Sequence, residues 1–340
     1  MRVLIFHTGG TLMMRGGDPS PLVPDVFTRD ILAELPVLAR VAEIESRILF
    51  ALDSSDMQPE HWVTIAEAVY GALCETRADG GRRFDGIVIV HGTDTMAYTA
   101  SALSFLLGGI DRPVILTGAQ RPLGEVRTDA RANLVDACFL ATQAIPEVAI
   151  AFSSKLYRGN RAVKLDAWSM DAFGSPTCPP LADLGVTLET GDHILAAQTP
   201  LPFDRRIEPR VLGIRVFPGL DPAIVAGALD TGIQGLLLVA FGSGNVPQRE
   251  RSLIPIIAEA TARDIPVVVV SQCVRGGVDL RRYEGGVSAL SAGAISGGAM
   301  TPEAAVTKLM VALGRGSGQP KVALAREAFA NIWAGEDDAM

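Results

Sequence analysis

The fold of this chain is decided by one stretch, residues 87–95, which reads Ile87-Val88-Ile89-Val90-His91-Gly92-Thr93-Asp94-Thr95. Its first four residues are apolar and β-branched, which is typical of a strand buried on both faces of a sheet. The polar run that follows offers a glycine for a turn and an Asp-Thr pair suited to the start of a helix. An amphipathic segment of helix length, residues 95–107, comes next. Strand, polar turn and helix in this order indicate an α/β protein with parallel strands.

The same pattern recurs along the chain. Short apolar runs predict strands at residues 3–6, 44–49, 87–90, 114–116, 148–151, 211–216, 236–240 and 267–270. Amphipathic segments predict helices between several of them, at residues 59–76, 95–107, 128–143 and 248–263. Such alternation of strands and helices favours parallel sheets covered by helices.

Length and proline content indicate two domains. At roughly 100–200 residues per domain, 340 residues are enough for about two. The alternating pattern breaks in residues 173–209, which hold six prolines, and then restarts on a smaller scale. We therefore expect a larger N-terminal catalytic α/β domain over residues 1–185, a linker over 186–210 and a smaller C-terminal α/β domain over 211–340.

Composition and charge restrict the classes of function. With 38 acidic and 30 basic residues, the net charge of −8 favours a small-molecule substrate over nucleic acid or a membrane surface. The four cysteines form no CxxC pair, which indicates free thiols and no metal site. The apolar run at the N-terminus is too short for a signal peptide, and no run is long enough to span a bilayer. We expect a cytoplasmic protein.

Polar residues follow the predicted strands of the N-terminal half. In an open parallel sheet, ligands bind beyond the carboxyl ends of the strands. The first four strands are followed there by Thr8-Gly9-Gly10-Thr11, Asp53-Ser54-Ser55-Asp56, His91-Gly92-Thr93-Asp94-Thr95 and Thr117-Gly118-Ala119-Gln120, and the fifth leads through a longer loop to Lys164. This convergence predicts a functional site at one edge of the sheet.

The residue types at this edge suit covalent catalysis by a hydroxyl group. A threonine becomes a nucleophile when a base takes its proton and backbone N–H groups hold the oxyanion. A partly desolvated Lys164, paired with an aspartate, could be the base that deprotonates Thr93. Taken alone, each motif also fits a plainer interpretation: a glycine turn, a helix cap or a solvated lysine. His7 and His91 are interpreted as structural, because no serine-elbow or zinc-protease motif accompanies them.

Together, these motifs resemble the paired threonine signatures of the bacterial-type L-asparaginases. Further runs resemble the cytoplasmic, type I branch of that family. They are Asp53-Ser54-Ser55-Asp56-Met57, Met96-Ala97-Tyr98-Thr99-Ala100-Ser101-Ala102-Leu103-Ser104-Phe105, Leu156-Tyr157-Arg158-Gly159-Asn160-Arg161, Gly244-Asn245 and Gln272-Cys273. The resemblance therefore covers most of the chain.

The resemblance implies a fold, a reaction and a set of roles. The fold is a larger and a smaller α/β domain, in protomers that assemble as dimers or tetramers. The reaction is hydrolysis of L-asparagine to L-aspartate and ammonia through an acyl-threonine, with no cofactor. The implied catalytic residues are the nucleophile Thr11 and the set Thr93, Asp94 and Lys164. The implied substrate-binding residues are Gly10 for the oxyanion, Asp94 for the α-ammonium, Ser54 and Ser55 for the α-carboxylate, Gly118, Ala119 and Gln120 for the amide, and Asn245 reaching a neighbouring protomer's site.

Two other functions remain open on the same scaffold. An amidotransferase subunit acting on aminoacyl-tRNA would bring an extra N-terminal domain and a basic face. A non-catalytic amino-acid sensor would keep the groups that bind substrate and could lose the nucleophiles. The presence of Thr11, Thr93 and Lys164, with a net charge of −8, favours the amidohydrolase.

The loop after Thr11 departs from the family pattern. Relatives carry a tyrosine there, whereas residues 12–24 contain none, and the nearest matching positions are Pro21 and Leu22. We expect this glycine- and proline-rich segment to close as a lid. Lys164 acting through Thr93, or a bound water, would then move the Thr11 proton. The alternative hydroxyl donors are Ser20 and Thr28, and control by asparagine near Cys273 stays open.

Overall fold

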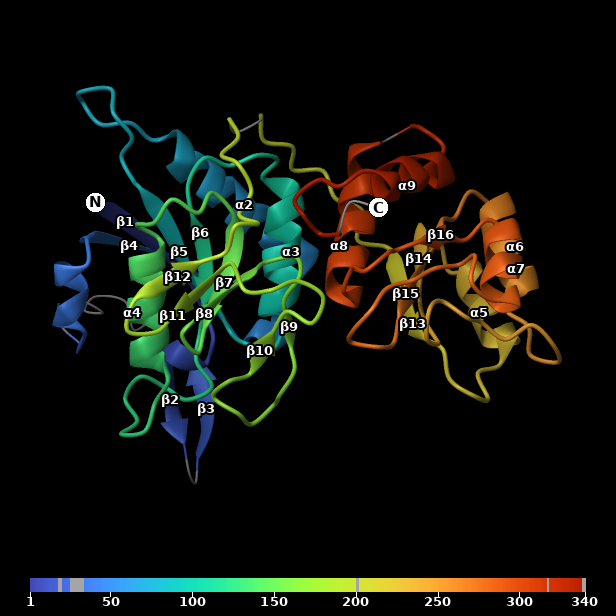
Figure 1. The fold of residues 1–340 in the computed structure, drawn as a ribbon, viewed down its shortest axis with the longest axis horizontal. Coiled ribbons are helices and arrows are strands. Elements are labelled where there is room, and N and C mark those ends of the chain that lie inside the picture. Colours follow the sequence, from blue (N-terminus) through green and yellow to red (C-terminus); the bar gives the residue numbers. More distant parts are fainter. Residues whose placement is uncertain (18–19, 25–33, 200–201, 317, 338–340) are drawn as a thin grey trace. The chain divides into compact units, whose positions relative to one another are not determined.

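The computed structural model describes residues 1–17, 20–24, 34–199, 202–316 and 318–337. It divides into two compact units, Met1–Arg205 and Arg206–Met340, each with its own sheet (Figure 1). The expected fold class, a larger α/β unit with a mostly parallel sheet followed by a smaller one, is confirmed.

The first unit is built on one large sheet. In the described part of the chain it has eight strands in the order β12-β11-β8-β7-β6-β5-β1-β4. Neighbours from β7 to β4 run parallel, and β8, β11 and β12 add antiparallel pairs at the other side. The bounds are β1 (Arg2–Gly9), β4 (Glu43–Leu52), β5 (Gly86–Val90), β6 (Val114–Thr117), β7 (Val148–Phe152), β8 (Lys155–Arg158), β11 (Ala182–Leu184) and β12 (Leu188–Thr190). The strands predicted from apolar runs therefore form the parallel part.

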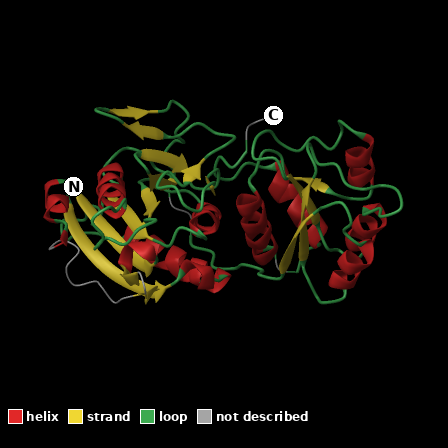
Figure 2. Cartoon of the chain, turned by 90° about the horizontal axis from the view of Figure 1, so that it is seen from below, coloured by secondary structure: helices red, strands yellow, loops and turns green. Residues whose placement is uncertain are grey.

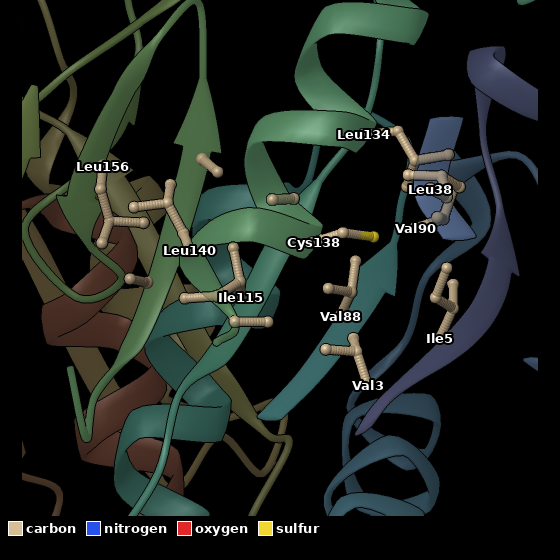
Figure 3. Close-up of a cluster of buried hydrophobic side chains, with 14 of the residues drawn as sticks. Val3, Ile5, Leu38, Val88, Val90, Ile115, Leu134, Cys138, Leu140 and Leu156 are labelled. Atoms are coloured by element: carbon tan, nitrogen blue, oxygen red, sulfur yellow. The ribbon is translucent and has the colours of Figure 1, made fainter. Parts of the chain in front are cut away.

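Helices cover both faces of this sheet. They are α2 (Pro59–Cys74), α3 (Met96–Leu106) and α4 (Ala130–Leu140), with 3-10 turns η1 (Thr11–Met13), η2 (Pro36–Arg40) and η3 (Ser54–Asp56). Alternate strand residues such as Val3, Val88 and Ile115 pack with Cys138 of α4 in one core cluster (Figure 3). The intervening residues point to the opposite face, where α3 lies (Figure 1). Both faces of the central strands are thus shielded from solvent, which explains why these strands are continuous apolar runs.

Two hairpins project from the loops of the first unit. The pair β2 (Met14–Gly17) and β3 (Ser20–Pro24) follows the first strand, in the segment expected to act as a lid. The pair β9 (Val163–Lys164) and β10 (Phe173–Gly174) carries the predicted lysine. Thr28 lies outside the described residues.

The segment predicted as a linker, 186–210, is partly structured. Its residues 188–190 form β12, which pairs antiparallel with β11 after a turn at Gly185. This strand was not predicted from the sequence, because a strand of three residues with mostly exposed side chains leaves no apolar run.

The second unit is a smaller parallel sheet between helices (Figure 2). Its strands are β13 (Val211–Arg215), β14 (Gly235–Ala240), β15 (Val267–Ser271) and β16 (Ile295–Ser296). Its helices are α5 (Pro222–Leu229), α6 (Ile254–Ala262), α7 (Glu284–Ser291), α8 (Pro302–Arg315) and α9 (Lys321–Ala330). Helix α6 begins six residues later than the predicted start at residue 248, since Pro255 fits the first turn of a helix but not its interior.

Candidate active site

Glycines bring the two threonine motifs into backbone contact. Gly10 has φ +87°, and a Cβ there would lie 2.3 Å from the Gly92 nitrogen. A Cβ on Gly92 would in turn lie 2.4 Å from Ser54 Oγ. No side chain fits at either position, so the loops after β1 and β5 touch main chain to main chain, and the Ser54 side chain of the loop after β4 packs against Gly92. Thr11 and Thr93 each directly follow one of these glycines, and the fold therefore places the two motifs together.

The amide of Gly10 has a backbone partner. Its N–H donates to the carbonyl oxygen of Leu52 at 3.0 Å. In this structure the proton is therefore directed into the sheet edge and not toward a substrate. The oxyanion role expected for Gly10 stays a prediction, and it requires this hydrogen bond to open.

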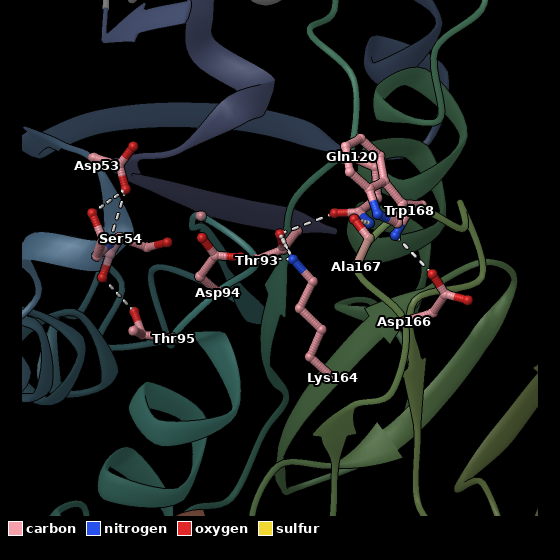
Figure 4. A network of polar contacts seen from close by, with 12 residues as sticks. Asp53, Ser54, Thr93, Asp94, Thr95, Gln120, Lys164, Asp166, Ala167 and Trp168 are labelled. Atoms are coloured by element: carbon pink, nitrogen blue, oxygen red, sulfur yellow. Dashed lines mark hydrogen bonds and ion pairs between the residues drawn. The ribbon is translucent and has the colours of Figure 1, made fainter.

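Lys164 contacts the threonine and the aspartate of residues 91–95. Its Nζ donates to Thr93 Oγ1 at 2.8 Å and to Asp94 Oδ1 at 2.7 Å (Figure 4). The Lys164 side chain is 18% exposed, the Asp94 side chain 65%, and Thr93 is buried. An ion pair this open to water adds little to stability. Its effect is to hold the lysine nitrogen against the threonine hydroxyl.

The loop after β6 packs against residues 91–93. A Cβ on Gly118 would lie 2.3 Å from the carbonyl oxygen of His91, and Ala119 is fully buried. The hydroxyl of Thr93 donates to Gln120 Oε1 at 3.1 Å. Thr93 therefore sits between Lys164 and Gln120, accepting from one and donating to the other (Figure 4).

The two serines predicted to bind a carboxylate lie in η3. Asp53 Oδ1 accepts from the Ser55 N–H at 2.9 Å and from the Ser55 hydroxyl at 2.8 Å. The carbonyl of Ser54 accepts from Thr95 Oγ1 at 2.7 Å, which ties this turn to the start of α3. Ser54 is buried and Ser55 is exposed. Their shared substrate role stays a prediction.

Three residues that were not selected from the sequence hold this site. Asp129 accepts from the Gln120 N–H at 2.9 Å and from the Arg121 N–H at 3.0 Å. Asn133 Nδ2 donates to the Gly118 carbonyl at 3.0 Å. Thr99 Oγ1 lies 2.9 Å from His91 Nε2. The sequence signal for Asp129 and Asn133 is their spacing of four residues at the start of the predicted helix 128–143, which puts an acid and an amide on one face of that helix.

His91 and His7 are structural, as interpreted from the sequence. His91 Nδ1 donates to the Gly92 carbonyl at 2.7 Å, since that oxygen can only accept, and Nε2 then accepts from the Thr99 hydroxyl. His7 Nε2 lies 2.8 Å from Ser46 Oγ. Burial lowers the pKa of each imidazole to about 4. Both rings are therefore neutral near pH 7, and His91 fixes the backbone that leads to Thr93.

These two histidines should make stability depend on pH. Their pKa is about 4 in the folded chain against 6.5 as the ordinary value, so the unfolded chain binds the protons first. The free energy of unfolding should fall as the pH drops from about 6.5 to about 4, by up to about 3 kcal/mol for each histidine. Urea unfolding of wild type and His7→Gln between pH 6.5 and pH 4 measures how much His7 contributes to the pH dependence of the free energy of unfolding. Identical pH slopes for the two proteins would contradict the assignment.

Asn245 belongs to the second unit. It closes a tight loop after β14, where its N–H donates to the Phe241 carbonyl at 2.8 Å and its carbonyl accepts from the Phe241 N–H at 3.0 Å. Gly244, with φ +105°, allows this turn. The expectation that Asn245 reaches a neighbouring protomer's site stays a prediction.

The described residues contain neither a candidate metal centre nor a candidate membrane-spanning helix. No three His, Cys, Asp or Glu side chains among them come together in a way that could hold a metal ion. No helix in the described ranges has both the length and the apolar character needed to cross a bilayer.

The chain is an α/β enzyme with a polar centre that combines the Thr93 hydroxyl with the Lys164–Asp94 pair. The chain belongs to the asparaginase family. The family model "Asparaginase, N-terminal" matches residues 2–195, and "Glutaminase/Asparaginase C-terminal domain" matches residues 210–325.

Individual relatives are similar to this chain over nearly its whole length. The L-asparaginase of Thermococcus kodakarensis is 39% identical over 322 residues, which are 92% of this chain and 93% of that protein. Its solved structure matches with a TM-score of 0.88 at 38% identity, covering 100% of both chains. L-asparaginase 1 of Escherichia coli is 38% identical over 90% of each chain. A glutamyl-tRNA(Gln) amidotransferase component of Methanothermobacter thermautotrophicus is 36% identical over 98% of this chain and 76% of its own length.

Proposed function

We propose that this protein hydrolyses L-asparagine to L-aspartate and ammonia. The observation that carries the proposal is the position of Lys164 Nζ, within 2.8 Å of Thr93 Oγ1 and 2.7 Å of Asp94 Oδ1, beside the backbone contact that brings in Thr11. The names of the two L-asparaginase relatives support the substrate.

The proposed reaction proceeds through an acyl-threonine. Thr11 Oγ attacks the carbon of the side-chain amide, the C–N bond breaks, and the amide nitrogen leaves as ammonia with the hydroxyl proton. A water then attacks the ester, releases aspartate and returns a proton to Thr11. Thr93, with Lys164 and Asp94, relays the protons in both halves. Covalent catalysis divides the hydrolysis of an unreactive amide into two easier steps.

Substrate recognition follows from the charges at the same edge. Asp94 would hold the α-ammonium, and its 65% exposed side chain leaves room for a second cation beside Lys164. Ser54 and Ser55 would bind the α-carboxylate, and the buried loop of Gly118 and Ala119 would line the amide pocket.

This arrangement should discriminate strongly against glutamine. With the α-amino and α-carboxylate groups fixed, one extra methylene displaces the carboxamide by about 1 Å or more, which spoils the attack geometry and costs on the order of 10²-fold. The kcat/KM values for asparagine and glutamine, measured by ammonia release, test this. Comparable values would contradict it.

The alternatives are less well supported. A subunit of an aminoacyl-tRNA amidotransferase would bind a polyanion, for which a net charge of −8 is unsuited. A non-catalytic sensor would have no need of the Lys164–Thr93 contact. Stoichiometric release of ammonia and aspartate from asparagine by the purified chain supports the proposal. Binding of asparagine without turnover would favour the sensor, and activity only with charged tRNA would favour the amidotransferase.

The assembly and compartment are part of the proposal. We expect a homodimer or homotetramer in which Asn245 contributes to a neighbouring protomer's site, and a cytoplasmic location, where the four free cysteines would stay reduced. Light scattering gives the oligomeric state. An Asn245→Ala variant that keeps full activity in an intact oligomer would remove Asn245 from the site.

A further inference from the structure

The side chain of Gln120 is bonded at every polar position. Its Nε2 donates to the carbonyl oxygens of Ala167 at 3.2 Å and Ser169 at 3.1 Å. Its Oε1 accepts from the Thr93 hydroxyl. Carbonyl oxygens only accept hydrogen bonds, so turning the amide over would set Oε1 against two other oxygens. The orientation of this carboxamide is therefore determined by its partners.

This orientation determines the direction of the Thr93 proton. Oε1 of Gln120 has no proton to give, so the Thr93 hydroxyl must donate to it. The lone pairs of Thr93 are then left for Lys164, which donates to them at 2.8 Å. In the resting site, Lys164 is the donor and Thr93 keeps its proton. The proton of Thr93 reaches Lys164 only after the bond to Gln120 opens.

We propose that Gln120 is a positioning residue that links the loop of residues 166–169 to the hydroxyl of Thr93 and so sets when that hydroxyl can pass on its proton. This role rests on the proposed hydrolysis of asparagine. It differs from the contact with the substrate amide that the sequence suggested.

Hydrogen bonds hold the residues at both ends of this link in place. The main chain of Gln120 is held by Asp129. On the other side, Asp166 Oδ1 accepts from the N–H groups of Trp168 at 2.7 Å and Ser169 at 2.8 Å (Figure 4). These bonds hold the pKa of the Asp166 carboxyl below its usual value. The loop therefore keeps its shape near neutral pH and presents two carbonyl oxygens to Gln120.

Two substitutions separate positioning from substrate binding. Gln120→Met keeps the length of the side chain and removes all three hydrogen bonds. We expect kcat to fall roughly 10- to 100-fold with KM within about threefold of wild type, because a misplaced proton-transfer group affects the transition state more than binding. The matched control is Gln143→Met, three residues after the end of α4, where Nε2 likewise donates to a backbone carbonyl, that of Phe139 at 3.2 Å. Its kcat should match wild type.

The second substitution gives a pH signature that a merely structural role would not. In Gln120→Glu, the ionised carboxylate faces the oxygens of Ala167 and Ser169, whereas the neutral acid can donate to one of them. Its kcat relative to wild type should therefore be low at pH 8 and recover as the pH falls toward about 5. The kcat of Gln120→Met relative to wild type should stay flat. Because the ratio of the Gln120→Glu kcat to the wild-type kcat is followed across pH, this variant remains informative if the methionine variant folds poorly.

Hydrogen exchange tests the link without substrate. The amides of residues 166–173 should exchange faster in Gln120→Met than in wild type or Gln143→Met. The proposal is overturned if kcat stays within threefold of wild type, if the loss lies in KM alone, if the Gln120→Glu ratio does not change with pH, or if exchange is unaltered. If wild type releases no ammonia from asparagine, the proposed function fails. The hydrogen-exchange measurement then still shows whether Gln120 holds the loop of residues 166–169.

Discussion

Lys164→Met should lower kcat for asparagine hydrolysis by about 10³-fold or more while leaving asparagine binding largely intact. The substitution keeps most of the side-chain volume and removes the nitrogen that contacts both Thr93 and Asp94. Members of a catalytic set act as a unit, so their losses do not add. Thr93→Val should cost a similar factor, and the double variant should be little worse than either single one. Thr11→Ala should abolish turnover in the same assay.

Steady-state kinetics by ammonia release, with binding measured by calorimetry, checks this expectation. Lys155→Met is the control, because Lys155 lies at the start of β8 in the same unit and takes no part in the site. Near-normal turnover by Lys164→Met, or strictly additive losses in the double variant, would remove Lys164 from the mechanism.

Gly10→Ala should strongly reduce both the stability and the activity of the protein. The new Cβ would lie 2.3 Å from the Gly92 nitrogen at a residue with φ +87°. A non-glycine residue in this backbone region costs about 1–3 kcal/mol, and forcing the two loops apart adds a similar amount. We expect a loss of about 3 kcal/mol or more in unfolding free energy and activity below about 1% of wild type, since Thr11 moves with the loop.

The matched control is Gly71→Ala. Gly71 is exposed in α2 with open space around it, so alanine there should stabilise the protein by roughly 0.5–1 kcal/mol and leave kcat unchanged. Urea unfolding and kcat measured on both variants test the pair. A Gly10→Ala protein with wild-type stability and kcat would show that the close contact between the two loops is not needed.

The parallel part of the first sheet was predictable because the burial of each strand is visible in its own short run of residues. Strands β1, β5, β6 and β7 are buried on both faces, so each is a continuous apolar run, and each ends in polar residues that leave the sheet together. The same rule placed Thr93 and Asp94 at one edge of the sheet. Lys164 lies beyond the antiparallel strand β8, in β9, and the structure brings it into contact with both residues.

What could not be predicted depends on partners far apart in the sequence. The antiparallel strand β12 is short and mostly exposed, and only its pairing with β11 defines it. The bond from Gly10 to Leu52 and the one from Gln120 to Ser169 join residues separated by 42 and 49 positions. No local pattern shows which amide will meet which carbonyl, so the sequence could place Gln120 at the site but could not show what its side chain holds.

Adding hydroxylamine to the reaction with asparagine tests whether hydrolysis proceeds through an acyl group on Thr11. Hydroxylamine competes with water for an acyl-enzyme after ammonia has left. A mechanism through an acyl-threonine predicts that wild type forms aspartyl hydroxamate in place of aspartate, in a ratio that rises linearly with hydroxylamine concentration, and that Thr11→Ala forms neither product. Aspartate alone at every hydroxylamine concentration, with ammonia released at the wild-type rate, would contradict it.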